Sequence, residues 1–155
     1  MYRSHVPGAV RLAYLLTGDA DIAQDIAHDA FIRTTGRLKH LRYPDAFAAY
    51  LRRAVVNACA SHHRKRSAEM SYLRREAGRR GNETESLPDL GVREELRMVL
   101  QELPLRQRAA LVLRYYEDLS EQQIADALKC SVPAARSLLF RGLDTLRSEF
   151  RGGER

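Results

Sequence analysis

The strongest constraint on the fold is the pattern of residues 119–147, LSEQQIADALKCSVPAARSLLFRGLDTLR. Ser120 and Gln123 have the S-x-x-Q spacing of a capping box, in which each side chain bonds the other residue's backbone N–H at a helix start. Ser131 is a second capping residue, and Pro133 falls in the first turn after it, where a missing N–H costs little. The pattern predicts two helices separated by a tight turn.

The second of these helices has two different faces. Its apolar seam follows helical spacing and consists of Ala135, Leu139, Gly142, Leu143, Leu146 and Phe150. Its outer face carries Arg136, Ser137 and Arg141. The turn before it falls at Lys129 and Cys130. This is the layout of a helix-turn-helix, whose second helix enters a DNA major groove.

The rest of the chain favours an all-helical fold, all-α in class. Its 155 residues allow one ordinary domain or two small ones, and strand-like alternation is scarce. The net charge of +6 is clustered, which favours a polyanionic partner. No apolar run is long enough to span a bilayer, and the two cysteines imply no disulfide framework. We expect a soluble cytoplasmic protein without membrane insertion or cofactor.

Two helices are predicted before residue 38, over residues 6–16 and 20–37, with Asp19 as the cap of the second. The outer face of that second helix repeats one carboxylate every four residues, at Asp21, Asp25 and Asp29. Like charges at this spacing oppose one another by a few tenths of a kcal/mol per pair. The stripe is either a docking surface for a basic partner or a solvated acidic face.

A third helix is predicted over residues 46–65, after a loop over 36–44. Its exposed face carries Arg53, Asn57 and Arg64, flanked by Arg52 and Ser61, and it ends in His62, His63, Arg64, Lys65 and Arg66. No acidic residue occurs between positions 52 and 66. Lysines and arginines that neutralise phosphates release counterions, and an exposed Asn can read a base edge. The alternative is a solvated basic helix end, which also suits the helix dipole.

The residue composition divides the chain into two predicted domains and a linker. Residues 67–91 are rich in Arg, Glu, Ser and Gly and low in hydrophobicity, which is typical of a flexible linker, with a short helix near residues 72–77. We expect a three-helix domain over residues 1–66 and a four-helix domain over residues 92–151. In the second domain Pro104 starts a helix, and the arginines expected to point outward are Arg106, Arg108 and Arg114.

Three segments carry a resemblance to a known family. Residues 103–147, LPLRQRAALVLRYYEDLSEQQIADALKCSVPAARSLLFRGLDTLR, resemble region 4 of bacterial RNA polymerase sigma factors. DADIAQDIAHDAFIRTTGRL and DAFAAYLRRAVVNACASHHRKR resemble region 2. Both blocks, joined by a linker without region 3, resemble the extracytoplasmic-function (ECF) subgroup. The resemblance implies a promoter-specificity subunit, not an enzyme, that binds core RNA polymerase and directs initiation at promoter DNA.

The resemblance also implies roles for matching residues. Those that would bind core polymerase, at the place of the family's D-L-x-Q-E motif, are Asp25, Ile26, His28 and Asp29. Those that would hold the melted minus-ten strand are Arg42, Tyr43, Phe47, Arg53, Asn57, Ser61, His62, Arg64 and Lys65. Those that would lie at the minus-thirty-five element are Ser131, Pro133, Ala134, Arg136, Ser137 and Arg141.

The chain departs from the family pattern at several positions. His28 stands for Gln and Asp29 for Glu, whereas Leu138 replaces a usual basic residue and Ala134 a frequent Thr. The subgroup also commonly has an anti-sigma factor that masks the DNA- and core-binding faces, which makes such a factor a further candidate partner.

Two other classes of function are alternatives. An ordinary helix-turn-helix regulator would bind duplex DNA tightly without polymerase. A metal site could use Cys59 with His62 or His63, at helical spacing, but a closed zinc site usually needs four ligands. Burial of Cys59 as a small apolar residue is the favoured interpretation.

Overall fold

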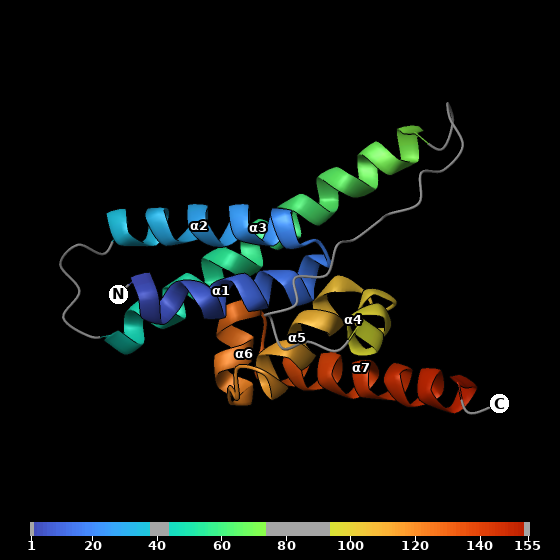
Figure 1. Cartoon of the computed structure of the whole chain (residues 1–155). Coiled ribbons are helices and arrows are strands. Elements are labelled where there is room, and N and C mark those ends of the chain that lie inside the picture. Colours follow the sequence, from blue (N-terminus) through green and yellow to red (C-terminus); the bar gives the residue numbers. More distant parts are fainter. Residues whose placement is uncertain (1, 38–43, 74–93, 154–155) are drawn as a thin grey trace.

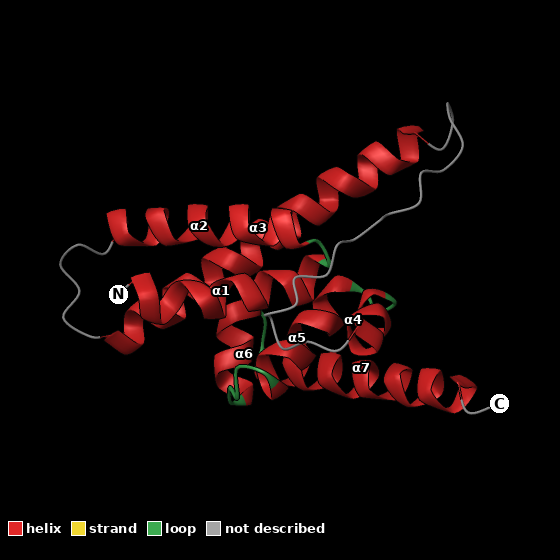
Figure 2. Cartoon of the chain, viewed as in Figure 1, coloured by secondary structure: helices red, strands yellow, loops and turns green. Residues whose placement is uncertain are grey.

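The computed structural model describes residues 2–37, 44–73 and 94–153. Within these ranges the chain is helical throughout, apart from short turns (Figures 1 and 2). The helices are α1 (Tyr2–Thr17), α2 (Ala20–Arg37), α3 (Pro44–Leu73), α4 (Glu94–Gln101), α5 (Leu105–Tyr115), α6 (Glu121–Leu128) and α7 (Val132–Gly153). The prediction of an all-α fold is confirmed.

Helix α1 lies at the centre of the molecule. It packs against α2 and α3 on one side and against α4 and α5 on the other. Its residues 12–16, LAYLL, are buried on every side of the helix, which is the pattern of a helix surrounded by other elements. Thr17 and Gly18 end it, and Asp19 caps α2 by accepting hydrogen bonds from the backbone N–H groups of Asp21 and Ile22.

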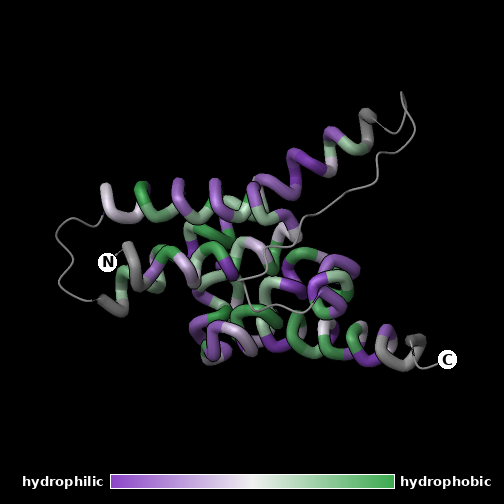
Figure 3. The backbone as a smooth tube through the Cα atoms, viewed as in Figure 1, coloured by the Kyte–Doolittle hydropathy of each residue, from purple (hydrophilic) through white to green (hydrophobic). Residues whose placement is uncertain are grey.

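Helix α3 is longer than the sequence pattern predicts. It runs past the predicted end at residue 65 to Leu73, and its C-terminal part projects beyond the other helices (Figure 1). This projecting part is strongly hydrophilic (Figure 3). Residues 67–73, SAEMSYL, contain the good helix formers Ala, Glu, Met and Leu, so the helix continues without needing an apolar face to bury. The predicted domain boundary after residue 66 therefore falls inside α3, while residues 74–91 of the predicted linker lie outside the described part of the chain.

The N-terminal group (α1–α3) and the C-terminal group (α4–α7) share one continuous apolar core. Carbonyl groups at the C-terminal end of α1 are met by polar side chains from the C-terminal group. Arg108 donates to the Leu16 carbonyl oxygen, Gln101 Nε2 to that of Leu15 at 3.3 Å, and Arg97 Nη1 to that of Gly18 at 3.3 Å. The last carbonyls of a helix have no partner within the helix, so these side chains satisfy them.

Arg108 corrects one sequence expectation. It was predicted to point outward, but only 4% of it is exposed. Its guanidinium also donates to the carbonyl oxygens of Leu100 at 2.8 Å and Leu103 at 2.9 Å, near the end of α4. A guanidinium has five N–H donors in a fixed plane, which suits it to bond the ends of two helices at once. Burial lowers the pKa of Arg108 to about 10, which leaves it charged at neutral pH.

Candidate nucleic-acid and docking interfaces

The capping box predicted at the start of α6 is confirmed. Ser120 Oγ accepts from the backbone N–H of Gln123 at 3.2 Å, and Gln123 Oε1 accepts from the backbone N–H of Ser120 at 2.9 Å. The predicted turn follows, with Lys129 in the left-handed region at φ 55° and ψ 49°. Ser131 then caps α7, because its Oγ accepts from the backbone N–H of Ala134 at 3.2 Å.

Helix α7 is held against α5 at Gly142. A Cβ atom at this position would lie 2.8 Å from Leu111 Cδ1 and 3.5 Å from the Gln107 carbonyl oxygen, so the absence of a side chain sets the close approach of the two helices. Ala135 is fully buried, and Leu139, Leu143 and Leu146 pack against the core. The predicted apolar seam is therefore confirmed for its members up to Leu146. The side chain of Phe150 lies outside the described residues.

The face of α7 opposite this seam is exposed. Its exposed members among the predicted residues are Ser131, Pro133, Arg136, Ser137 and Arg141, whereas Ala134 is half-buried. Leu138, at a position where the family usually has a basic residue, packs against the core instead. Leu138 therefore contributes to the packing of α7 and not to its exposed face.

Three residues on or beside this face were missed by the sequence analysis as site residues. Phe140 is 71% exposed, and its position four residues after Arg136 could have placed it on the outer face. Glu121 begins α6, and Arg114 at the end of α5 lies close enough to lower the pKa of Glu121. Nothing in the sequence separation of Glu121 and Arg136 reveals that the two side chains meet.

Glu121 and Arg136 form an ion pair between the two helices of the helix-turn-helix. Arg136 Nε lies 2.8 Å from Glu121 Oε2, and Arg136 Nη2 lies 3.4 Å from Oε1. The hydrogen bond to Arg136 lowers the pKa of Glu121, and the same bond raises the pKa of Arg136. The Arg136 side chain remains 64% exposed, so it is held in place while still accessible from solvent.

The candidate basic face on α3 is exposed in part. Asn57, Ser61, Arg64 and Lys65 are exposed, whereas Arg53 and His62 are half-buried. Arg64 Nη2 donates to Ser61 Oγ at 3.2 Å, one turn earlier on the helix. These residues therefore lie along one side of α3 and are available to a polyanion.

Phe47 lies in the core and does not belong to this face. It is 3% exposed, and its ring centroid lies 5.7 Å from that of Phe31 and 4.9 Å from that of His5. Aromatic pairs at such distances stabilise a core, and a ring that is almost wholly buried is not accessible to a flipped base. The prediction that Phe47 captures a base is therefore not supported by its position. The other two predicted members of the capture loop, Arg42 and Tyr43, lie outside the described residues.

The acidic stripe on α2 is also exposed. Asp21, Asp25, His28 and Asp29 all point to solvent, and Ile26 is half-buried between them and the core. Asp29 Oδ2 lies 3.0 Å from Arg33 Nε in an ion pair between two exposed side chains. Exposed ion pairs contribute little to stability, so this one can open if a partner supplies its own cations.

Cys59 is buried in the middle of α3. It is 1% exposed, and burial raises its pKa to about 12, while the nearby Arg108 acts in the opposite direction. Burial also lowers the pKa of His63, which Arg108 and His62 lower further. The part of the chain that the structure describes contains no group of three or more His, Cys, Asp or Glu side chains placed to hold a metal ion. Cys59 therefore behaves as a small core residue.

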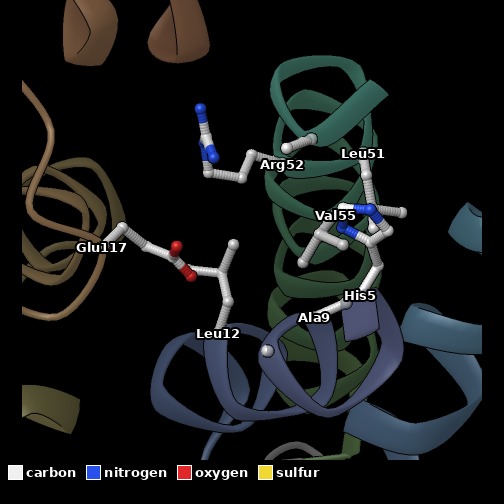
Figure 4. A pocket seen from close by; sticks show the side chains of 9 residues that line it. His5, Ala9, Leu12, Leu51, Arg52, Val55 and Glu117 are labelled. Atoms are coloured by element: carbon white, nitrogen blue, oxygen red, sulfur yellow. The ribbon is translucent and has the colours of Figure 1, made fainter. Parts of the chain in front are cut away.

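A pocket of about 140 Å³ lies where α1, α3 and the α5–α6 connection meet (Figure 4). Glu117, from that connection, points toward Leu12 of α1, and Arg52 extends from α3 on the same side. Burial raises the pKa of Glu117, and the positive charges of Arg52 and Arg11 act in the opposite direction. Pockets for drug-sized ligands usually measure about 300–1,000 Å³, so this space is too small for such a ligand and forms a charged part of the junction between the two helix groups.

No helix in the described ranges is long and apolar enough to cross a membrane.

The family model for sigma-70 region 2 matches residues 1–69, and the model for sigma-70 region 4 matches residues 93–146. The first match therefore includes α1, α2 and most of α3, and the second includes the helix-turn-helix. The two exposed charged faces on α2 and α3 fall in the region 2 match.

Curated relatives match almost the whole chain. The RNA polymerase sigma-E factor of Streptomyces avermitilis is 32% identical, over 95% of this chain and 81% of its own length. The RNA polymerase sigma-H factor of Pseudomonas aeruginosa is 31% identical, over 83% of this chain and 72% of its own. The ECF RNA polymerase sigma factor SigW of Bacillus subtilis is 29% identical, over 91% of this chain and 82% of its own.

A solved structure shares the fold. The sigma factor RpoE of Bartonella quintana, determined in complex with the anti-sigma factor NepR, superposes with a TM-score of 0.75 at 19% identity, over 97% of this chain and 94% of that chain. Two consecutive sigma-70 regions, relatives that match over most of both chains, and a shared fold lead to one conclusion: the protein belongs to the ECF group of bacterial RNA polymerase sigma factors.

Proposed function

We propose that this protein is a cytoplasmic, non-enzymatic promoter-specificity subunit that binds core RNA polymerase and directs transcription initiation. The observation that carries the proposal is the presence of both sigma regions in order on one chain, each with an exposed charged face. The acidic face on α2 is suited to a basic protein surface, and the basic faces on α3 and α7 are suited to nucleic acid.

Core polymerase binds at the acidic face in this proposal. Asp25 and Asp29 present their carboxylates from consecutive turns of α2, with His28 beside them and Ile26 as a half-buried apolar contact. Compared with the D-L-x-Q-E pattern of the family, Asp29 keeps the charge on a shorter side chain and His28 keeps a hydrogen-bonding group.

The melted minus-ten strand lies along α3. Arg53, His62, Arg64 and Lys65 supply positive charge or donors toward phosphates, and Asn57 and Ser61 are exposed polar residues that can reach base edges. Arg42 and Tyr43, which precede α3 in the sequence, complete this set. Phe47 is left out, because its ring belongs to the core.

The minus-thirty-five element lies in the groove that receives α7. Arg136 and Arg141 flank Ser137 and Phe140 on the exposed face, with Ser131, Pro133 and Ala134 at the N-terminal end of the helix. Phe140 adds an apolar surface that suits the methyl group of thymine. An anti-sigma factor that covers either basic face would block promoter binding.

The proposal is tested by transcription from a pool of fragments of the source genome, with purified core RNA polymerase, with and without this protein. Start sites that appear only with the protein support it, and their upstream sequences reveal the two promoter elements. A protein that binds duplex DNA tightly without polymerase and produces no start sites would be an ordinary helix-turn-helix regulator.

The docking surface has its own test. The double variant Asp25→Lys, Asp29→Lys should bind core polymerase at least about tenfold more weakly, because two attractive contacts become repulsive. Both side chains are exposed, so the melting temperature should change little. The matched control is Asp126→Lys, an exposed charge reversal on α6 outside the acidic face. Normal core binding by the double variant would contradict the assignment of α2.

A further inference from the structure

The ion pair between Glu121 and Arg136 has a specific geometry. Glu121 is the first residue of α6, and Arg136 lies in the second turn of α7, fifteen residues later in the chain. The carboxylate receives Nε at 2.8 Å and Nη2 at 3.4 Å, so it occupies the side of the guanidinium that carries the Nε–H. Within the described part of the chain, these are the hydrogen bonds that Arg136 makes.

This geometry leaves one particular edge of the guanidinium open. Arginine has five N–H donors in a plane, and Glu121 uses one on Nε and one on Nη2. The remaining donors are the two on Nη1 and one on Nη2, which include the pair of N–H bonds at the end of the side chain. An end-on pair of donors matches the O6 and N7 acceptors of guanine in the major groove.

We propose that Glu121 is a positioning residue, which holds the Arg136 guanidinium so that its end-on edge reads a guanine of the minus-thirty-five element. This inference rests on the proposed function. An exposed arginine without such a partner has several rotamers and can turn toward a phosphate, which carries no sequence information. The ion pair favours one orientation before DNA binds, and this bias is what adds discrimination.

The charge balance agrees with a role in specificity. A carboxylate on a surface that binds DNA weakens the general attraction to phosphates, so Glu121 is unfavourable for affinity alone. Its contribution to stability is small, because the pair joins an exposed arginine to a half-buried glutamate and is screened by water. An acidic residue beside Arg114 and Arg136 on the basic face is explained if its benefit is to orient the Arg136 guanidinium.

The experiment uses the full chain with core polymerase and a duplex library in which the minus-thirty-five base pairs of a promoter found by the transcription test are randomised. Bound and unbound duplexes are sequenced to give the base preference at each position. The variants are Arg136→Ala, Glu121→Gln and Glu121→Asp. The matched control, Asp126→Asn, also removes one exposed negative charge from α6, but from a side chain that bonds Gln122.

Arg136→Ala should abolish a guanine preference at one position. Glu121→Gln and Glu121→Asp should each reduce the same preference by up to about fivefold, the size expected for the loss of an exposed ion pair. Glu121→Asp keeps the negative charge, but its side chain is one methylene shorter. A loss of guanine preference in this variant therefore shows that the position of the carboxylate matters and not only its charge. Glu121→Gln should also bind random duplex more tightly, with a salt slope steeper by up to about 0.9.

Several results would overturn the inference. An unchanged guanine preference in both Glu121 variants, or the same loss in Asp126→Asn, would exclude positioning by Glu121. Loss of preference at a different base pair would mean that Glu121 contacts DNA directly. If Arg136→Ala changes no position, the proposed role of Arg136 fails as well, and the inference fails with it. Melting curves that match the unmodified protein exclude misfolding as the cause of any loss.

Discussion

At the scale of single residues, burial decides what the two cysteines can do. Cys59 is enclosed in the core, and its pKa is raised to about 12, mainly because burial disfavours the thiolate. Cys130 is only half-buried in the turn before α7. The thiolate is the nucleophile in alkylation, so a thiol that stays protonated and enclosed reacts slowly.

We therefore expect iodoacetamide to modify Cys130 in the native protein and Cys59 only after unfolding. Peptide mass spectrometry over time at pH 8 checks this, with both cysteines reacting in guanidinium chloride as the control. The raised pKa of Cys59 also makes the free energy of unfolding depend on pH. Between about pH 9 and pH 12 the folded state keeps the Cys59 proton, whereas the unfolded state loses it. The free energy of unfolding therefore falls as the pH rises through this range. Equal reaction rates for the two native cysteines would contradict this account.

At the scale of helices, the contact between α5 and α7 depends on Gly142. Alanine is the better helix former by about 1 kcal/mol, so an exposed Gly→Ala change in a helix usually stabilises. Here the added Cβ would lie 2.8 Å from Leu111 Cδ1, and Leu111 is itself buried. Overpacking of this kind costs about 1–3 kcal/mol.

Gly142→Ala should therefore lower the free energy of unfolding by about 1 kcal/mol and displace α7 relative to α5. Urea unfolding measures the change in the free energy of unfolding. The matched control is Gly36→Ala near the end of α2, where nothing lies within 4 Å of the added atom and a small gain is expected. A smaller cost of Gly142→Ala in a Leu111→Ala background than in the unmodified protein would confirm the contact, whereas a stabilised Gly142→Ala variant would exclude it.

At the scale of the whole molecule, Arg108 joins the N-terminal and C-terminal helix groups. Its guanidinium donates to Leu16 of α1 and to Leu100 and Leu103 at the end of α4. Promoter elements named minus ten and minus thirty-five are about 25 base pairs apart, which is about 85 Å at 3.4 Å per base pair. A compact chain of this length has a radius of gyration of about 15 Å, so under the proposed function the two groups would have to separate for both elements to be bound at once.

Arg108→Met should destabilise the protein by about 3 kcal/mol or more, because it leaves several buried carbonyl groups without a donor. Arg106→Met is the matched control, since Arg106 is exposed and donates to one carbonyl, that of Leu128 at 3.0 Å. Urea unfolding followed by far-UV circular dichroism measures both. Equal effects of the two substitutions would show that the Arg108 contacts do not hold the groups together.

Much of this protein is determined by its sequence because the responsible interactions are local. The caps at Ser120 and Ser131, the cap at Asp19 and the exposed stripe at Asp25 and Asp29 all depend on residues no more than one turn apart, so spacing alone predicts them. The family, and with it the all-α fold, follows from two longer patterns in a fixed order.

The tertiary structure decided what spacing cannot express. Arg108 is charged and lies on a helix with other outward-pointing arginines, yet it is buried because the ends of α1 and α4 meet there and need donors. Phe47 belongs to the core because α1 and α2 cover it with His5 and Phe31. Glu121 meets Arg136 because a left-handed residue at Lys129 turns the chain back on itself. In each case the contact joins separate elements, and only their packing brings the side chains together.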